Sequence, residues 1–269
     1  MRRPVLATLI AAAAASALLA GCGAPAAGDA ASAAGTEPGS ATTPAVAGEI
    51  TVLAAASLTE AFTTLGRQFE AAHPGASITF SFGPSSGLAT QITEGAPVDV
   101  FASASTATMD DVVAAGAAAA PAVFADNVME IAVPASNPAG VTALADLARP
   151  EVKVALCQPA VPCGAGAASV LAAAGLTVTP VTLEADVKAT LTKVVLGEVD
   201  AGVVYATDVL AAGDTVTGIE IPADVNAATS YPIASLAASK NPHLAKAFVD
   251  YVLSGDGASV LTAAGFRRP

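Results

Sequence analysis

The sequence predicts an α/β protein with two mostly parallel sheets flanked by helices. From residue 49 onward, short apolar stretches typical of strands alternate with amphipathic stretches typical of helices. Several of these strands lead into a helix through a short turn rich in serine, glycine or proline. The stretch from Glu49 to Pro269 is also long enough for one large domain or two small ones.

The expected elements follow one another in a regular order. Strands are expected near residues 50–54, 77–82, 98–102, 127–133, 152–156, 201–205 and 231–237. Helices are expected near residues 58–72, 86–94, 105–115, 164–174, 186–196 and 242–254. Such alternation implies parallel strands joined by crossovers, with ligands at the carboxyl ends of the strands.

Two segments are candidates for the chain passing from one lobe to the other and back. They are the strand from Asn127 to Pro134 and the segment from Ser230 to Leu236. We therefore predict that lobe 1 comprises residues 49–130 plus 232–269 and that lobe 2 comprises residues 131–231.

The N-terminal residues indicate export. A positive start is followed by an apolar run from Val5 to Ala20 that is too short to span a membrane, which predicts a signal peptide over residues 1–21. The run closes on Leu19-Ala20-Gly21-Cys22, which resembles the lipobox of bacterial lipoproteins, so Cys22 is expected to carry lipid. Residues 22–48 are then a lipidated cysteine and a tether rich in Ala, Gly, Pro, Ser and Thr that is expected to be disordered.

The charge of the chain restricts its partners. The formal net charge is −12, and loss of the signal peptide would remove two further arginines and no acid. This balance argues against nucleic acid and against a membrane surface held by electrostatics. An anion bound by this protein must therefore be held by local dipoles and not by the overall field.

The first strand–helix junction places a serine where an anion could bind. Ser57 follows the strand 50–54 and lies at or beside the N-cap of the next helix, where unpaired N–H groups carry partial positive charge. The alternative is a capping box, because Ser57-Leu58-Thr59-Glu60 matches the S-x-x-E pattern that satisfies only backbone donors.

Other junctions add hydroxyls and helix starts. Ser85 and Ser86 lie in Gly83-Pro84-Ser85-Ser86-Gly87, which could equally be an ordinary turn. A further junction runs from Cys157 to Gly164. Asp186 can cap a helix whose apolar face is formed by Val187, Leu191, Val194 and Val195. Tyr205 ends a strand, so its hydroxyl could enter the same cleft, although a half-buried packing role is the alternative.

Taken together, these junctions resemble the periplasmic molybdate-binding proteins of molybdate ABC transporters. The resemblance rests on segments that keep their order along residues 49–269: Ala54–Leu58, Phe82–Ile92, Gly95–Ala104, Val161–Gly164, Asp186–Lys188, Gly202–Tyr205 and Ala263–Phe266. It implies a two-lobed periplasmic-binding-protein fold, type II-like, with the ligand in the cleft between the lobes. It also implies that the protein is not an enzyme.

The resemblance assigns roles residue by residue. Ser57 and Ser85 would donate from hydroxyl and backbone groups, Cys163 and Val187 from main-chain N–H groups, and Tyr205 from its phenol. Cys163 departs from the alanine common in the family, but a backbone donor survives a change of side chain. Pro84 stands where serine is common and has no N–H, which leaves the donors around Ser85 less defined.

The implied ligand is molybdate or tungstate, with no cofactor and no direct metal ligand. A dianion that only accepts hydrogen bonds suits neutral donors, which reject species that must also donate a proton, such as hydrogen phosphate. The implied partners are ABC permease subunits and, through the lipid anchor, the outer face of the cytoplasmic membrane, and we expect a monomer. Sulfate or another small oxyanion is the alternative ligand; an iron-type site would need clustered tyrosines or carboxylates.

A Ser/Cys hydrolase is the alternative from another class. The two histidines, His73 and His243, both stand beside proline and are expected at the surface, so no base is indicated for Ser57 or Cys163. Because Cys22 is expected to be lipidated, one pair of cysteines remains in an oxidising compartment, and we predict a Cys157–Cys163 disulfide. Two buried free thiols are the alternative.

Overall fold

The α/β class is confirmed by the computed structural model, which describes residues 46–269. The predicted signal peptide, Cys22 and all but the end of the tether lie outside the described residues. Within the described part of the chain, no helix is both long and apolar enough to cross a membrane.

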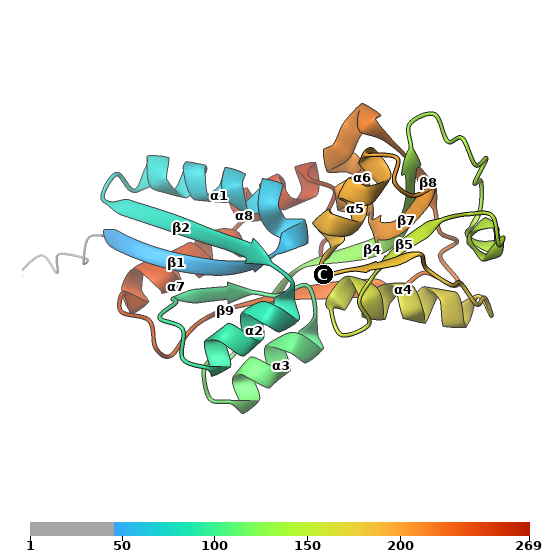
Figure 1. The fold of residues 1–269 in the computed structure, drawn as a ribbon. Coiled ribbons are helices and arrows are strands. Elements are labelled where there is room, and N and C mark those ends of the chain that lie inside the picture. Colours follow the sequence, from blue (N-terminus) through green and yellow to red (C-terminus); the bar gives the residue numbers. More distant parts are fainter. Residues whose placement is uncertain (1–45) are drawn as a thin grey trace, which may run out of the picture. The chain divides into compact units, whose positions relative to one another are not determined.

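All the strands and helices expected from the sequence are present, with shifted ends (Figure 1). The strands are β1 (Gly48–Ala55), β2 (Ala76–Gly83), β3 (Val100–Ala102), β4 (Ala122–Pro134), β5 (Val154–Cys157), β6 (Thr182–Glu184), β7 (Ala201–Tyr205), β8 (Val216–Glu220) and β9 (Ala228–Ser235). The helices are α1 (Thr59–Ala72), α2 (Ser85–Thr93), α3 (Thr106–Ala114), α4 (Pro162–Ala173), α5 (Val187–Val195), α6 (Ala206–Ala212), α7 (Pro242–Val252) and α8 (Gly255–Ala263), with 3-10 turns η1 (Ala56–Leu58), η2 (Leu144–Ala148) and η3 (Gly213–Thr215).

Four of these elements were missed in the sequence, namely β6, β8, α6 and α8. Strands β6 and β8 have 3 and 5 residues, too few for a clear alternation of apolar and polar side chains. Helix α6 has 7 residues and follows β7 without an intervening loop, so its pattern merges with that of the strand. Helix α8 starts three residues after α7 ends, and Ser254 caps it by accepting a hydrogen bond from the Gly257 N–H.

Strand β4 joins what the sequence analysis expected to be two sheets. The strand order is β2-β1-β3-β9-β4-β7-β5-β6, and β8 also pairs with β4. Residues 122–128 of β4 pair with β9, whereas residues 129–134 pair with β7 and β8. The two expected sheets therefore share this 13-residue strand. We call β2, β1, β3, β9 and residues 122–128 the first half of the sheet, and the remainder the second half.

The sheet is mixed, which corrects the expectation of mostly parallel strands. Pairing is parallel along β2-β1-β3 and along β6-β5-β7. It is antiparallel wherever β4 or β9 takes part. Strand β4 leads the chain into the second half, and β9 leads it back to the first. Because β9 lies beside β4 on the way back, it must run in the opposite direction.

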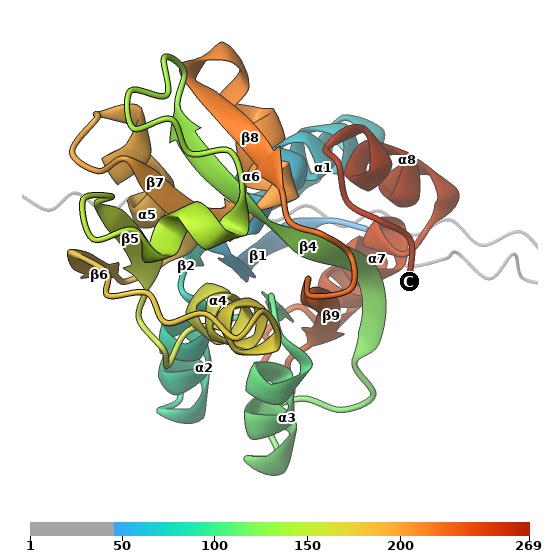
Figure 2. The ribbon, with the colours of Figure 1, turned by 90° about the vertical axis from the view of Figure 1, so that its right-hand side faces the viewer.

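Helices cover both faces of each half (Figures 1 and 2). In β1, Val52 and Ala54 pack into a core with α1, α7 and α8, whereas Leu53 packs on the other face with α2 and α3. The alternation follows from the two-residue repeat of a strand, and it explains why β1 is apolar and buried from Val52 to Ala55. In the second half, α4 lies on one face and α5 and α6 on the other (Figure 2).

The buried apolar residues form three clusters. One cluster takes its members from residues 129–221 together with Ala56. The other two take theirs from residues 50–125 and 231–266. The lobe boundaries at 130/131 and 231/232 stay a prediction.

Candidate anion-binding site

The residues predicted to bind the ligand surround one cavity. The empty space between its walls is about 230 Å³, including its opening to solvent. The lining consists of strand ends and helix starts: Ala55, Ala56, Ser57, Gly83, Pro84, Ser85, Ala104, Val161, Pro162, Cys163, Asp186, Val187 and Tyr205. All five predicted ligand residues are among them, although they lie far apart in the sequence.

Ser57 lies in the 3-10 turn η1 between β1 and α1, and its side chain is buried. Helix α1 begins at Thr59 with Leu58 as its N-cap, and no side chain caps it. The capping-box alternative is therefore wrong, because Ser57 lies within η1 and precedes the N-cap residue of α1. The Ser57 Oγ instead lies 2.9 Å from the Tyr231 hydroxyl oxygen.

Ser85 is the first residue of α2, directly after the N-cap residue Pro84. Its side chain is buried, and its Oγ accepts a hydrogen bond of 3.0 Å from the Ala104 N–H. A serine oxygen that accepts in this way still has its own proton to donate. The alternative of an ordinary turn does not describe this segment, because its Ser85 hydroxyl is buried and lines the cavity.

The second half contributes the starts of two helices. Cys163 is the second residue of α4, and Val187 is the first residue of α5. Amides in the first turn of a helix have no carbonyl partner within the helix and carry partial positive charge. Asp186 caps α5 as predicted, since its Oδ1 accepts from the Ala189 N–H at 2.9 Å. Val195, expected on the apolar face, is in fact 43% exposed.

The predicted disulfide between Cys157 and Cys163 is confirmed. It ties the end of β5 to the start of α4, next to the Cys163 amide. Gly164 fits the same turn because a side chain there would collide with the Gln158 carbonyl oxygen. Since Cys163 is oxidised to a disulfide, its sulfur is not available as a nucleophile.

Tyr205 is completely enclosed, which departs from the half-buried packing role considered for it. It is 1% exposed, and its hydroxyl has no hydrogen-bond partner among the described residues. Burial raises the pKa of the phenol well above its usual value, with further contributions from Tyr231 and Asp208. The hydroxyl is therefore a neutral donor that still requires an acceptor.

No lysine, arginine or histidine is among the residues that line the cavity. The one acidic residue of the lining, Asp186, caps the N-terminus of α5 by accepting from the Ala189 N–H. His243 is exposed and His73 is half-buried against Phe69, so neither offers a base to Ser57. Nowhere in residues 46–269 do three or more His, Cys, Asp or Glu side chains group together in a way that could hold a metal ion.

Two buried polar side chains behind Ser57 were not singled out in the sequence. Tyr231 lies in β9 and Asn127 in β4, on the two strands that join the halves. The Asn127 Nδ2 lies 2.8 Å from the Thr207 Oγ1 and 3.4 Å from the Tyr231 hydroxyl oxygen. Their partners lie 80 to 174 positions away, so no local pattern identifies them.

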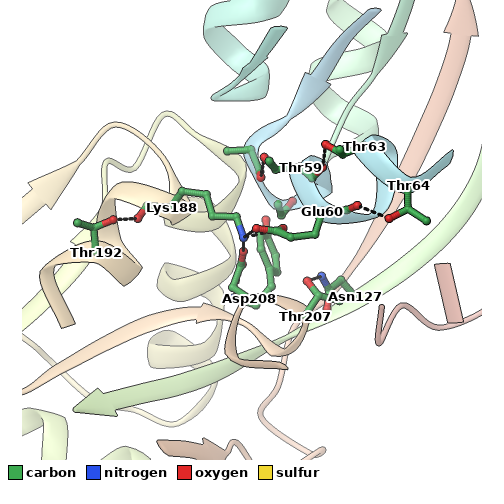
Figure 3. A network of polar contacts seen from close by, with 12 residues as sticks. Thr59, Glu60, Thr63, Thr64, Asn127, Lys188, Thr192, Thr207 and Asp208 are labelled. Atoms are coloured by element: carbon green, nitrogen blue, oxygen red, sulfur yellow. Dashed lines mark hydrogen bonds and ion pairs between the residues drawn. The ribbon is translucent and has the colours of Figure 1, made fainter. Parts of the chain in front are cut away.

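An ion-pair network beside the site was also missed (Figure 3). The Lys188 Nζ lies 2.9 Å from the Glu60 carboxylate of α1 and 3.0 Å from the Asp208 Oδ1 of α6. The latter contact is an ion pair with a fully buried carboxylate. Burial raises the pKa of Asp208 to about 6 although Lys188 opposes the shift. Burial also acts to lower the pKa of Lys188, but Asp208 and Glu60 outweigh it and raise that pKa.

Comparison with known proteins places this chain in a family. A family model described as bacterial extracellular solute-binding protein matches residues 50–267. The chain belongs to this family. It is 42% identical to the molybdate-binding protein ModA of Mycobacterium tuberculosis over 82% of this chain and 85% of that protein. It is 32% identical to the molybdate-binding protein ModA of Escherichia coli over 81% of this chain and 89% of that protein.

Solved structures of low sequence identity share the fold. The periplasmic molybdate-binding protein of Azotobacter vinelandii matches with a TM-score of 0.70 at 20% identity, over 82% of this chain and 99% of that chain. The sulfate-binding protein SubI of Mycobacterium tuberculosis matches with a TM-score of 0.72 at 20% identity, over 82% and 86%. The predicted periplasmic-binding-protein fold is thus confirmed, and the fold is common to proteins named for different oxyanions.

Proposed function

We propose that this protein binds molybdate or tungstate, one ion per chain, and delivers it to an ABC permease without changing a covalent bond. The observation that carries the proposal is the cavity at which Ser57, Ser85, Cys163, Val187 and Tyr205 meet without a basic side chain. The relatives named molybdate-binding proteins support the choice of ion.

The donor set suits a fully deprotonated oxyanion. Both serine oxygens are within hydrogen-bonding distance of protein donors, and the Tyr205 hydroxyl has no partner in residues 46–269. A dianion that only accepts can use every one of these protons, whereas hydrogen phosphate brings a proton that needs an acceptor. The donors come from both halves, and we propose that the two lobes predicted from the sequence close around the ion.

Thermal unfolding in the presence of oxyanions tests the proposal. Molybdate or tungstate at about a thousand times its dissociation constant should stabilise the fold by roughly 4 kcal/mol. For a chain of this size, the melting temperature should rise on the order of 10 °C. A shift with phosphate or a sugar but with neither metal oxyanion would overturn the assignment. Recovery of unchanged molybdate after incubation tests the non-enzymatic role.

Sulfate is the second candidate, because the fold resembles that of a sulfate-binding protein as closely as that of a molybdate-binding protein. Sulfate is smaller, so a closed site built for molybdate would leave some donors too far away. One lost charge-assisted bond corresponds to about a 10- to 150-fold change in affinity. Competition calorimetry separates the candidates: sulfate binding within about threefold of molybdate would favour sulfate.

We further propose that Cys22 anchors the mature, monomeric protein to the outer face of the cytoplasmic membrane. The motif that ends at Cys22 and the extracellular family support this location. Fractionation of cells that express the wild type or Cys22→Ala tests it. The wild type should sediment with membranes and incorporate labelled fatty acid, and the variant should do neither. A wild type without label would contradict the anchor.

A further inference from the structure

A buried chain of polar groups lies behind the candidate ligand residue Ser57. The Ser57 Oγ lies 2.9 Å from the Tyr231 hydroxyl oxygen, which lies 3.4 Å from the Asn127 Nδ2. Ser57, Asn127 and Tyr231 are 4%, 1% and 0% exposed. Buried polar groups of this kind need partners within the protein, so the direction of each hydrogen bond can be worked out.

The amide of Asn127 sets the direction. Its Oδ1 accepts from the Val128 N–H at 3.0 Å, because the opposite orientation would place two donors face to face. The Nδ2 therefore points toward Thr207 and Tyr231 and can only donate to them. The Tyr231 oxygen is the acceptor of this bond.

The proton of Tyr231 must then go to Ser57. Burial raises the pKa of Tyr231, so the phenol keeps its proton at neutral pH. Among residues 46–269 this hydroxyl has hydrogen-bond geometry with Asn127, which only donates, and with Ser57; the nearby Tyr205 hydroxyl has such geometry with no residue. The Ser57 Oγ accordingly accepts from Tyr231, and the proton of Ser57 remains available to a group in the cavity.

We propose that Tyr231 and Asn127 are positioning residues that orient the Ser57 hydroxyl as a donor to the bound oxyanion. This inference rests on the proposed function of the cavity and extends it to selectivity. The Ser85 hydroxyl is also left with its proton free to donate, because its Oγ accepts directly from the Ala104 N–H. Both serines of the first half thus face the ligand as donors, which disfavours any ligand that brings a proton of its own.

A double-mutant cycle in calorimetry tests the proposal with the full-length mature protein and molybdate. Tyr231→Phe keeps the ring and removes the hydroxyl, and it should weaken molybdate binding by about tenfold. Ser57→Ala should cost much less in the Tyr231→Phe background than in the wild type, since Ser57 no longer has a fixed orientation. Discrimination against hydrogen phosphate should also relax in Tyr231→Phe, because a rotating hydroxyl can accept a proton.

Two further variants complete the experiment. Tyr251→Phe is the matched control, because that hydroxyl donates to Gln68 at the surface, and its affinity should equal that of the wild type. Asn127→Asp reverses the direction of these hydrogen bonds, because a carboxylate only accepts. Tyr231 would then donate to residue 127, and Ser57 would donate to Tyr231 and no longer to a group in the cavity. This variant should weaken molybdate binding by more than Tyr231→Phe does, with a folded state verified by its melting curve.

The outcomes are distinct. Additive effects of Ser57→Ala and Tyr231→Phe, with unchanged discrimination against hydrogen phosphate, would overturn the positioning role even if both variants melt earlier. Asn127→Asp binding molybdate as tightly as the wild type would also overturn it. A wild type that binds neither molybdate, tungstate, sulfate nor phosphate would overturn the proposed function, and this inference with it.

Discussion

The two halves of the candidate site offer different kinds of donor. The first half supplies the buried hydroxyls of Ser57 and Ser85, each with its oxygen in contact with another protein donor. The second half supplies main-chain amides at the starts of α4 and α5, together with the Tyr205 phenol. A hydroxyl must be oriented by its neighbours, whereas an amide at a helix start is oriented by the helix itself.

This difference predicts where substitution is tolerated. In the second half, the amide of Cys163 belongs to the first turn of α4, so it remains in place whichever side chain the residue carries. In the first half, no substitution of Ser57 or Ser85 other than by another hydroxyl residue preserves the donor. The comparison can be tested by removing donors from each half in turn.

The largest effect is expected from the double variant Ser57→Ala/Ser85→Ala. Each serine should contribute about 1 to 3 kcal/mol to molybdate binding, because a charged acceptor in a desolvated site loses a donor. Calorimetry should therefore find a loss of up to about 6 kcal/mol for the pair. Ser86→Ala is the matched control, since Ser86 is the next residue of α2 and is absent from the cavity lining. An unchanged affinity in the double variant would remove the hydroxyls from the site.

The next effect concerns stability in the second half. Replacing Cys157 and Cys163 together by alanine should lower the free energy of unfolding by roughly 2 to 3 kcal/mol in the chain-entropy account of a short loop. Molybdate affinity should fall much less, because the Cys163 amide belongs to the helix. Chemical denaturation and calorimetry on the same preparation measure both quantities. A collapse of affinity with unchanged stability would show that the disulfide, and not the helix, holds the amide.

A smaller change is expected for the one side-chain donor of the second half. Tyr205→Phe keeps the ring and should weaken molybdate binding by about tenfold. Because the hydroxyl has no protein partner in the described residues, the unliganded variant should melt close to the wild type or slightly above it. Should the variant lose stability and keep its affinity, the packing role considered for Tyr205 would be the correct one.

The smallest effect lies where the halves meet, at the Glu60–Lys188–Asp208 network. The pKa of Asp208, about 6 in the folded protein, is above the ordinary value of 3.8. The folded state therefore binds more protons, and the stabilisation from this group is present at low pH and lost as the pH rises through about 6. Lys188 stays charged across this range. Lowering the pH from 6.5 to 5 should add about 1 kcal/mol from Asp208.

Asp208→Asn isolates this contribution. The difference in unfolding free energy between wild type and variant should change with pH over this window, whereas other titrating carboxylates contribute equally to both proteins and cancel. A difference that stays constant from pH 5 to 6.5 would mean that the carboxyl of Asp208 does not titrate there.

The sequence by itself determined the local features of this protein. The 3.6-residue repeat placed α1 from Thr59 to Ala72 within a residue of its predicted span, and Asp186 was recognised as the cap of α5. The resemblance to family motifs identified all five residues that line the cavity. These features depend on residues a few positions apart, so that a local pattern contains the information.

Only the tertiary structure decided the rest. Ser57 matched a capping box, yet a 3-10 turn and the distant Tyr231 hydroxyl give it a different partner. Strand β4 was expected to be shorter, and its antiparallel pairing with β9 makes one mixed sheet of the two expected ones. Lys188 meets Glu60 across 128 positions of the chain. Such contacts depend on complementary groups that meet only when the core has packed, and no periodicity of a single segment encodes them.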